Sequence, residues 1–203
     1  MKKIYALHPD YPRELVSILE SRPISWLTGK FARHFPLETF INSKLYQDTR
    51  EAQAFDVSAM RGNTLFLALE IAKTSETINK LSIIGTDLQG HGREVAESIA
   101  QFPKLKEINL IKTEEKNILD IIKVLLTSKS LSSIILGKVQ DEQTRILNLV
   151  ESHNKSLKEF QEQQKSEMHY LSEVVTLPIV ITDLIGEYYV DPIVEVKVEF
   201  GLF

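Results

Sequence analysis

The sequence predicts an α/β fold in which short parallel strands alternate with helices and stack in order as a solenoid. A phrase of three apolar residues, spaced apolar-x-x-apolar-x-apolar, occurs four times and begins at Ala52, Ile78, Leu105 and Leu131. These starts are separated by 26, 27 and 26 residues, and a constant interval of this size is typical of repeat proteins. Apolar residues at helical spacing follow each phrase, so every unit holds a strand and a helix.

Each phrase predicts a strand whose apolar residues face a layer of helices. We expect four parallel strands that begin within about three residues of the four starts, with the helices on the convex side. The helical spacing places the helices near residues 63–72, 95–102, 118–126 and 146–150. The strand residues that we expect to be buried between the layers are Phe55, Val57, Leu81, Ile83, Ile108, Leu110, Ile134 and Leu136.

The second unit carries the longest motif, which reads Ile78-x-x-Leu81-x-Ile83-x-x-Thr86-x-Leu88 and is followed by Gly92, Val95 and Ile99. This order resembles the leucine-rich repeat family, in its long, ribonuclease-inhibitor-like subtype. The resemblance covers residues 52–156 and implies a concave parallel sheet that binds a protein partner. The chain departs from the family at the usual Asn or Cys position, which here holds Met60, Thr86, Thr113 and Val139. An ordinary α/β domain with right-handed strand–helix–strand crossovers is the alternative.

The chain is expected to have three regions: a helical N-terminal cap at 1–50, about four repeats at 51–156, and a degenerate repeat with an α/β C-terminal cap at 157–203. Solenoid ends need such caps because an open end exposes the core. In the first cap we expect a helix over residues 10–21 and a helical stretch between Pro23 and Pro36. Beyond Leu157, a fifth unit or a long helix both fit, and the alternation in residues 192–200 predicts a strand.

Strand residues between the buried positions are expected to point to the open face of the sheet. The register predicts three rows, and the candidate partner-binding residues from them are Asp56, Ser58, Ser82, Ile84, Asn109, Ile111, Lys112, Ile135 and Lys138. Exposed isoleucines on a sheet face favour a cover, which is either a partner or the C-terminal segment of the chain itself. Lys112 and Lys138 would favour acidic groups on that partner.

Residues that carry chemistry are few, and we predict no catalytic residue, no metal site and no cofactor. The chain has no cysteine, and its five histidines are dispersed without the spacing of a metal site. The stretch from Gly85 to Gly92 lacks the Lys and Ser or Thr of a phosphate loop and fits a turn. With 24 Lys and Arg scattered among 28 Asp and Glu, a nucleic-acid partner is not expected.

The expected location follows from hydropathy. No run approaches the ~18 apolar residues of a membrane span, and the apolar stretch at the N-terminus is too short for a secretory signal. We therefore expect a monomeric, cytoplasmic, non-enzymatic protein that binds another protein. The cysteine-free composition, rich in Lys and Ile, also resembles effectors that intracellular bacteria such as Legionella deliver into host cells. This resemblance implies a host protein as partner and secretion into the host cytosol without a classical signal peptide.

The segment 177–189 supports an alternative function. It begins with Leu177-Pro178, continues with apolar residues at helical spacing and ends with Tyr188-Tyr189, which resembles the opening of an F-box helix. The resemblance implies a ubiquitin-ligase adaptor whose repeats select the target. A helix that starts with Pro178 and packs as a cap explains the same residues. An enzyme whose activity lies from about Leu171 onward is the remaining alternative.

Overall fold

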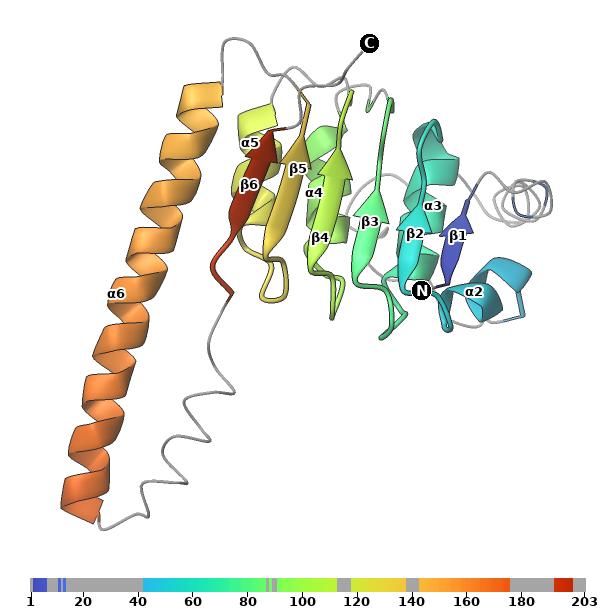
Figure 1. The fold of residues 1–203 in the computed structure, drawn as a ribbon. Coiled ribbons are helices and arrows are strands. Elements are labelled where there is room, and N and C mark those ends of the chain that lie inside the picture. The colour runs from blue at the N-terminus through green and yellow to red at the C-terminus, as the bar shows by residue number, and fades with distance from the viewer. Residues whose placement is uncertain are drawn as a thin grey trace.

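The computed structural model describes residues 2–6, 11, 13, 42–86, 88, 91–112, 118–137, 143–175 and 192–198. They form an open six-stranded sheet in which all neighbouring strands are parallel and follow one another in chain order (Figure 1). The strands are β1 (Lys3–Tyr5), β2 (Ala54–Asp56), β3 (Lys80–Ser82), β4 (Glu107–Leu110), β5 (Ser133–Leu136) and β6 (Glu195–Val198).

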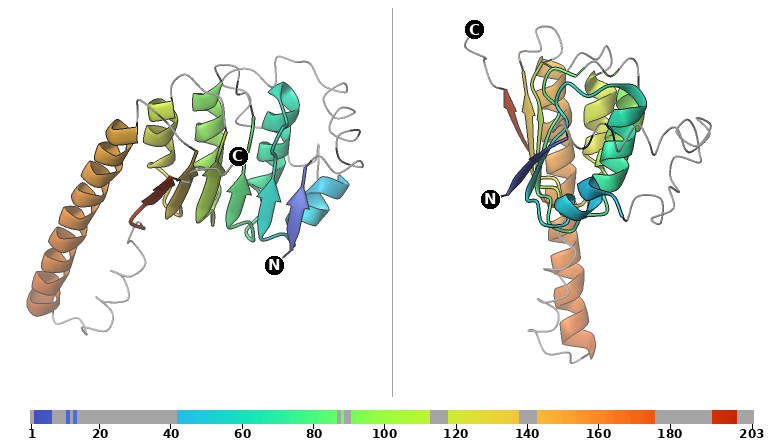
Figure 2. Two further views of the ribbon diagram at one scale, coloured as in Figure 1. Left: turned by 45° about the horizontal axis from the view of Figure 1, so that its top comes forward. Right: turned by 90° about the vertical axis from the view of Figure 1, so that its right-hand side faces the viewer.

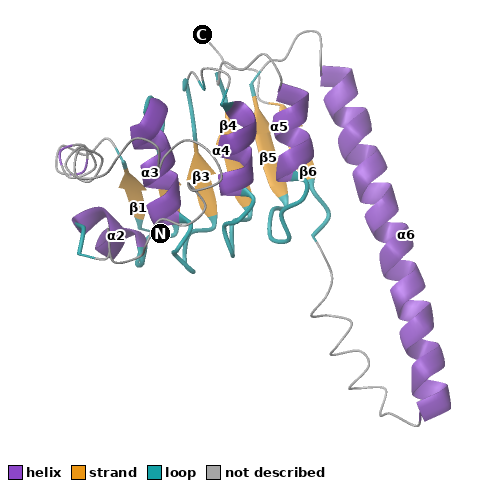
Figure 3. Cartoon of the chain, turned by 180° about the vertical axis from the view of Figure 1, so that it is seen from behind, coloured by secondary structure: helices purple, strands orange, loops and turns teal. Residues whose placement is uncertain are grey.

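Helices form a second layer on one face of this sheet. The described helices are α2 (Lys44–Thr49), α3 (Gly62–Ala72), α4 (Gly92–Ile99), α5 (Ile118–Leu125) and α6 (Gln143–Val175). Figure 3 shows α3, α4 and α5 side by side in front of the strands, and Figure 2 shows the two layers edge-on. Each helix contacts the next one along the chain, and α6 also contacts β6. The main core lies between the two layers.

The predicted α/β class and the four predicted strands are confirmed. Their first residues are Ala54, Lys80, Glu107 and Ser133, each two residues after the predicted start. Helices α3, α4 and α5 and the first turns of α6 lie where the apolar spacing placed them. All eight strand residues expected in the core are at most 4% exposed. The strand expected in residues 192–200 is β6.

Two features of the flanks differ from the sequence analysis or decide between its alternatives. Strand β1 was not predicted, yet it pairs with β2 and buries Ile4 in the core. The polar stretch after Leu157 belongs to the 33-residue helix α6 and not to a fifth strand unit. Of the helix expected over residues 10–21, only Tyr11 and Arg13 are described, and both are helical. The stretch between Pro23 and Pro36 lies outside the described residues.

One backbone carbonyl before each strand positions the strand that follows in the sheet. The Gln53 oxygen accepts hydrogen bonds from the N–H groups of Asn79 (2.9 Å) and Lys80 (3.1 Å). The Asn79 oxygen accepts in the same way from Lys106 (2.8 Å) and Glu107 (3.0 Å). Lys2 does the same for β2, and Lys106 for β5. The strands therefore start at one level, and their registers agree across the sheet.

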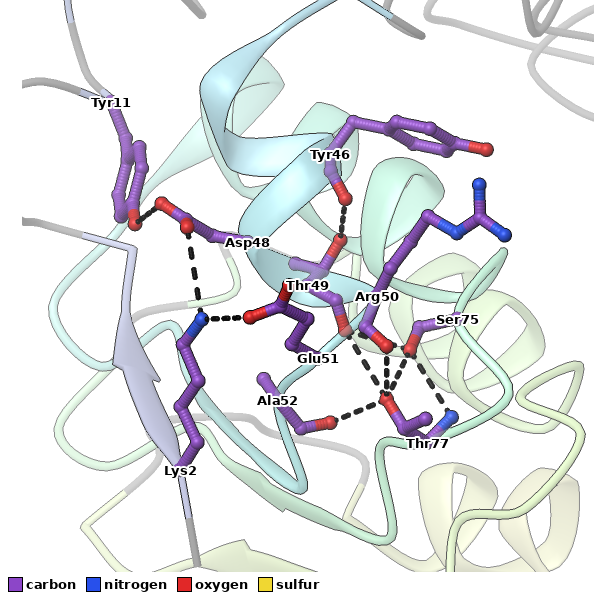
Figure 4. A network of polar contacts seen from close by, with 10 residues as sticks. All are labelled: Lys2, Tyr11, Tyr46, Asp48, Thr49, Arg50, Glu51, Ala52, Ser75 and Thr77. Atoms are coloured by element: carbon purple, nitrogen blue, oxygen red, sulfur yellow. Dashed lines mark hydrogen bonds and ion pairs between the residues drawn. The ribbon is translucent and has the colours of Figure 1, made fainter.

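Two hydroxyl groups in the turn before β3 form a hydrogen-bond network, shown in Figure 4. The Thr77 hydroxyl lies 2.7 Å from the carbonyl oxygen of Ala52 and 3.0 Å from that of Arg50. The Ser75 hydroxyl donates to the carbonyl oxygen of Thr49 at 2.8 Å. Thr49 and Arg50 stand at the end of α2, where carbonyl groups lack partners within the helix, and the hydroxyl groups donate to these carbonyls. This network connects the end of α2 and the chain after it to the turn before β3.

A second polar contact in Figure 4 joins β1 to α2. The Lys2 ammonium lies 2.7 Å from Glu51 and 3.9 Å from Asp48. The Tyr11 hydroxyl donates to the other side of the Asp48 carboxylate at 2.6 Å. These contacts connect the residues on both sides of β1 with α2 and the turn that follows it, although the two segments lie far apart in the sequence.

The turn after each of the first three repeat strands contains a residue in the left-handed region. The φ angles are +62° at Ala59, +64° at Gly85 and +56° at Lys112. Left-handed backbone crowds the Cβ of an L-residue and costs roughly 1–2 kcal/mol, whereas glycine adopts it freely. Two of the three turns therefore carry strain that the third one avoids.

This difference gives a paired prediction on neighbouring turns. Ala59→Gly should stabilise the protein by up to about 1 kcal/mol, because relief of strain exceeds the added entropy of the unfolded chain. Gly85→Ala should destabilise it by about 1 kcal/mol. No atom lies within 4 Å of the Cβ that would be added at Gly85, so the effect comes from the backbone alone. Urea unfolding measures both changes, and changes of equal sign would contradict the explanation.

A largely buried ion pair at the C-terminal end of α3 is hydrogen-bonded to α4 of the same helical layer. The Lys73 ammonium lies 2.6 Å from the Glu70 carboxylate on α3, and the side chains are 15% and 10% exposed. The Ser98 hydroxyl on α4 donates to the same carboxylate at 2.9 Å. Lys73 also donates to Gln101 at 3.2 Å. Glu70 is thus bonded by Lys73 and Ser98, and Lys73 by Glu70 and Gln101.

Removal of one member of this ion pair should therefore lower the stability of the protein more than removal of both members. We expect Lys73→Met to destabilise the protein by about 2 kcal/mol, because it leaves a buried carboxylate without its cation. The double variant Glu70→Met with Lys73→Met should recover part of that loss. The exposed Arg93–Glu97 pair on α4 provides the control, and Arg93→Met should change stability by less than about 0.5 kcal/mol. A double variant that loses the sum of both single losses would contradict this account.

Candidate partner-binding face of the sheet

The face of the sheet opposite α3, α4 and α5 is covered by no described helix (Figure 2). Strand pairing sorts its outward side chains into two rows, which we call the open face. The first row is Lys3, Ala54, Lys80, Glu107, Ser133 and Glu195. The second row is Tyr5, Asp56, Ser82, Asn109, Ile135 and Lys197. The predicted row from Asp56 to Ile135 is confirmed, and the edge strands extend it by one residue at each end.

All six charged side chains of the open face take part in ion pairs on that face. Lys3 lies 2.9 Å from Asp56, and Lys80 lies 3.1 Å from Glu107 on the adjacent strand. Lys197 pairs with Glu195 of its own strand at 3.3 Å. The formal charges of these residues cancel. A surface of this kind exerts little long-range attraction, so recognition would depend on close contacts and not on electrostatic steering.

The most enclosed charge of the open face is Asp56. Its Oδ1 accepts a hydrogen bond from the Ser58 N–H at 3.0 Å. Burial by itself would raise the pKa of Asp56, but hydrogen bonds from Ser58 and Lys3 outweigh it, and the pKa is lowered from the ordinary 3.8. The hydrogen bond with Asp56 also raises the pKa of Lys3 above its ordinary value, against the opposing effect of burial. The Lys3 ammonium lies 4.6 Å from the centre of the Tyr5 ring, which is 56% exposed.

The turns at the ends of the strands form a rim beside the open face. The Asn109 side chain accepts a hydrogen bond from the Ile111 N–H at 3.0 Å, as Asp56 does from Ser58. The Ser58 hydroxyl accepts from the Ile84 N–H at 2.9 Å, which joins the first two turns. At Gly137 an added Cβ would lie 3.2 Å from the Lys112 nitrogen, so the last two described turns approach closely. The rim is therefore fixed by side chains that bond to backbone.

The structure places the predicted site residues unequally. Asp56, Ser82 and Asn109 lie together in one half-buried row, and Ser58, Ile84 and Ile111 follow at the rim. Lys112 is exposed, whereas Lys138 lies outside the described residues. The expected exposure of Ile135 is wrong, since only 9% of it is accessible. Strand β6 pairs beside it, and the sequence analysis did not place any strand there.

Several residues of the open face were missed by the sequence analysis. Lys80 and Glu107 stand two positions before Ser82 and Asn109, and the alternation of a strand already assigns them to the same face. Tyr5 and Lys197 lie on the two strands outside the regular interval. The alternation around Ile4 was a usable signal for β1, but a segment of three residues gives weak evidence for a strand by itself.

Other kinds of site have no support in the described part of the chain. None of the described helices combines the length and the apolar composition that crossing a membrane requires. The described residues contain no group of three or more His, Asp or Glu side chains placed to hold a metal ion. No protein-family model, no curated protein and no solved structure matches this chain.

The lowered pKa of Asp56 predicts a loss of stability in acid. A carboxyl group with a lower pKa in the folded protein contributes stability above its unfolded value, about 3.8, and this contribution disappears as pH falls through the folded pKa. Asp56→Asn should cost about 1 kcal/mol at pH 7 and flatten the decline of stability below pH ~4.

Chemical unfolding between neutral pH and about pH 2.5 measures this dependence. Glu51→Gln provides the matched control, because Glu51 also accepts from a lysine but is exposed. Its curve should run parallel to that of the wild type. An Asp56→Asn curve with the wild-type slope would exclude Asp56 as a source of the acid sensitivity.

Proposed function

We propose that this protein is a non-enzymatic, leucine-rich-repeat-like binding module that holds a protein partner on its open face and rim. The observation that carries the proposal is an uncovered face made by six parallel strands, which presents two aligned rows of side chains. Repeat surfaces of this type present contacts from every unit, so a partner can be bound over several strands at once. Most contact residues would lie on rigid strands, which lowers the entropic cost of binding.

The repeat architecture is supported by three features that recur together. Paired residues of β2, β3, β4 and β5 are separated by 26, 27 and 26 positions. The same carbonyl-to-strand hydrogen bonds recur at each step. Left-handed residues recur in the turns after β2, β3 and β4. An ordinary α/β domain with crossovers of unequal length has no reason to repeat all three.

The chemistry of the face favours a partner with apolar and hydrogen-bonding groups over a strongly charged one. The charged residues are already paired, whereas Tyr5 offers an exposed aromatic ring and Ile84 and Ile111 are half-buried at the rim. Aromatic anchors surrounded by polar residues are characteristic of binding hot spots. Exposed Lys112 adds one positive charge that would suit an acidic group at the edge of the interface.

The host-protein partner and the effector role stay predictions from the sequence. The adaptor alternative depends on residues 177–189, which lie outside the described residues, so no structural observation favours it. A deletion of residues 172–203 would remove the segment on which that alternative depends, but it would also remove β6 from the sheet. Point substitutions on the open face therefore give the cleaner test of the binding function.

Affinity purification from host-like cytosol, with the full chain as bait, tests the proposal. The variant Ile84→Ser with Ile111→Ser should reduce capture of the partner at least tenfold, because it removes two apolar contacts at the rim. Since both residues are half-buried, we expect a loss of stability of about 1 kcal/mol each and retention of the fold. Ile135 is left intact because it is nearly buried.

Leu147 provides the matched control. It is 42% exposed and lies on α6, away from the open face. Leu147→Ser should leave capture unchanged. Full capture by the Ile84 and Ile111 double variant, together with loss of capture by Leu147→Ser, would place the partner on the helical side and overturn the proposal.

A further inference from the structure

A cavity of about 490 Å³ lies between α5, α6 and Pro192, and none of its lining residues belongs to the open face or rim. Its volume falls within the range of about 300–1,000 Å³ that small-molecule sites occupy. The binding of a protein on the sheet makes no use of this cavity. It is therefore a separate feature that needs its own explanation.

The walls of the cavity are fixed by packing and hydrogen bonds. Ile146 and Val150 bury the first turns of α6 in the core beside α5. The Asn154 amide donates to the Val194 carbonyl oxygen at 2.7 Å and accepts from the Val194 N–H at 3.0 Å. Because Pro192 stands two residues before Val194, this double hydrogen bond also holds the Pro192 wall against α6. A site with walls of this kind exists before any ligand arrives, which reduces the cost of binding.

The lining combines an apolar part with cationic and hydroxyl groups. The apolar part consists of Leu126, Leu149, Leu157 and Pro192. Lys123 and His153 provide the basic nitrogens, and none of the described lining residues is Asp or Glu. The Lys123 ammonium pairs with Asp120 at 3.1 Å, but more than half of each side chain is exposed. An ion pair so exposed is weak, so the ammonium can bind a ligand instead of Asp120 at little cost.

We propose that this cavity binds a small organic anion with a short aliphatic body. The anionic head would lie at Lys123 and His153, where it would accept charge-assisted hydrogen bonds. The aliphatic body would lie against the leucine side chains and Pro192, where it removes apolar surface from water. A cation of the same shape would meet the Lys123 ammonium, and the described lining residues offer it no carboxylate; Asp120 lies outside the lining.

Titration of the full chain by NMR with hexanoate, 1-hexanol, hexylammonium and acetate separates the two contributions. Hexanoate should bind at least tenfold more tightly than 1-hexanol and than hexylammonium, and acetate should bind more weakly than hexanoate because it lacks the aliphatic body. Chemical-shift changes on addition of hexanoate should be centred on α5 and α6 and absent from the open face. This separation keeps the result independent of whether the open face binds a protein.

Three variants test the location and the charge. Lys123→Met should weaken hexanoate binding about tenfold. Lys155→Met, on the exposed part of α6 outside the cavity, should leave it unchanged. Ser152→Trp should abolish binding by filling the cavity from an exposed helix position, and Ser156→Trp provides a second variant of the same kind if the first one unfolds.

Several results would overturn the proposal. They are equal binding of hexylammonium and hexanoate, unchanged binding in a folded Ser152→Trp or Ser156→Trp variant, and the absence of hexanoate binding at about 10 mM, which corresponds to less than about 3 kcal/mol of binding free energy.

Discussion

The fold depends on the hydrogen bonds by which one carbonyl oxygen receives two N–H groups from the next strand. Each such bond contributes only about 1 kcal/mol net, but it sets the register of the strand. A slip of one residue would turn Phe55, Leu81 and Ile108 out of the core and the open-face residues into it. Burial of the apolar positions therefore supplies the stability, and the carbonyl groups decide which side chains reach each face.

The four central strands were predictable because their apolar residues recur at a nearly constant interval, and the same alternation predicted the row from Asp56 to Asn109 correctly. The edge strands lie outside that interval, so β1 was missed, and β6 was seen as a strand but not placed beside β5. This omission explains the error at Ile135, whose exposure depends on that neighbour. The ion pairs of the open face were beyond reach for another reason. Two of the pairs join residues on adjacent strands, and the third joins Glu195 to Lys197 within β6. Whether the charged groups meet depends on a geometry that only the folded sheet defines.

The turns differ from those that the proposed resemblance to leucine-rich repeats implies. The family position for Asn or Cys holds Met60 and Thr86, and both side chains are buried. The hydroxyl of Thr86 has no hydrogen-bond partner among the described residues, so none of them shows it replacing the side chain that usually bonds the turn. Instead, Asp56 and Asn109 bond to the backbone two residues ahead, from the side of the open face. Residues expected to contact a partner thus also hold the turns in place.

The long connections to β1 and β6 have a consequence for the order in which the sheet assembles. Paired residues are separated by 26 or 27 positions between the central strands, but by 51 between β1 and β2 and by 62 between β5 and β6. Closing a longer loop costs more chain entropy before any contact compensates for it. The central strands can therefore form first as a local unit, and the two edges join a sheet that already exists. Besides strand pairing and the burial of Ile4 and Val194, each edge is held by polar contacts, Lys2 with Glu51 at one end and Asn154 with Val194 at the other. Local opening of the protein should begin at these two places and leave the central strands intact.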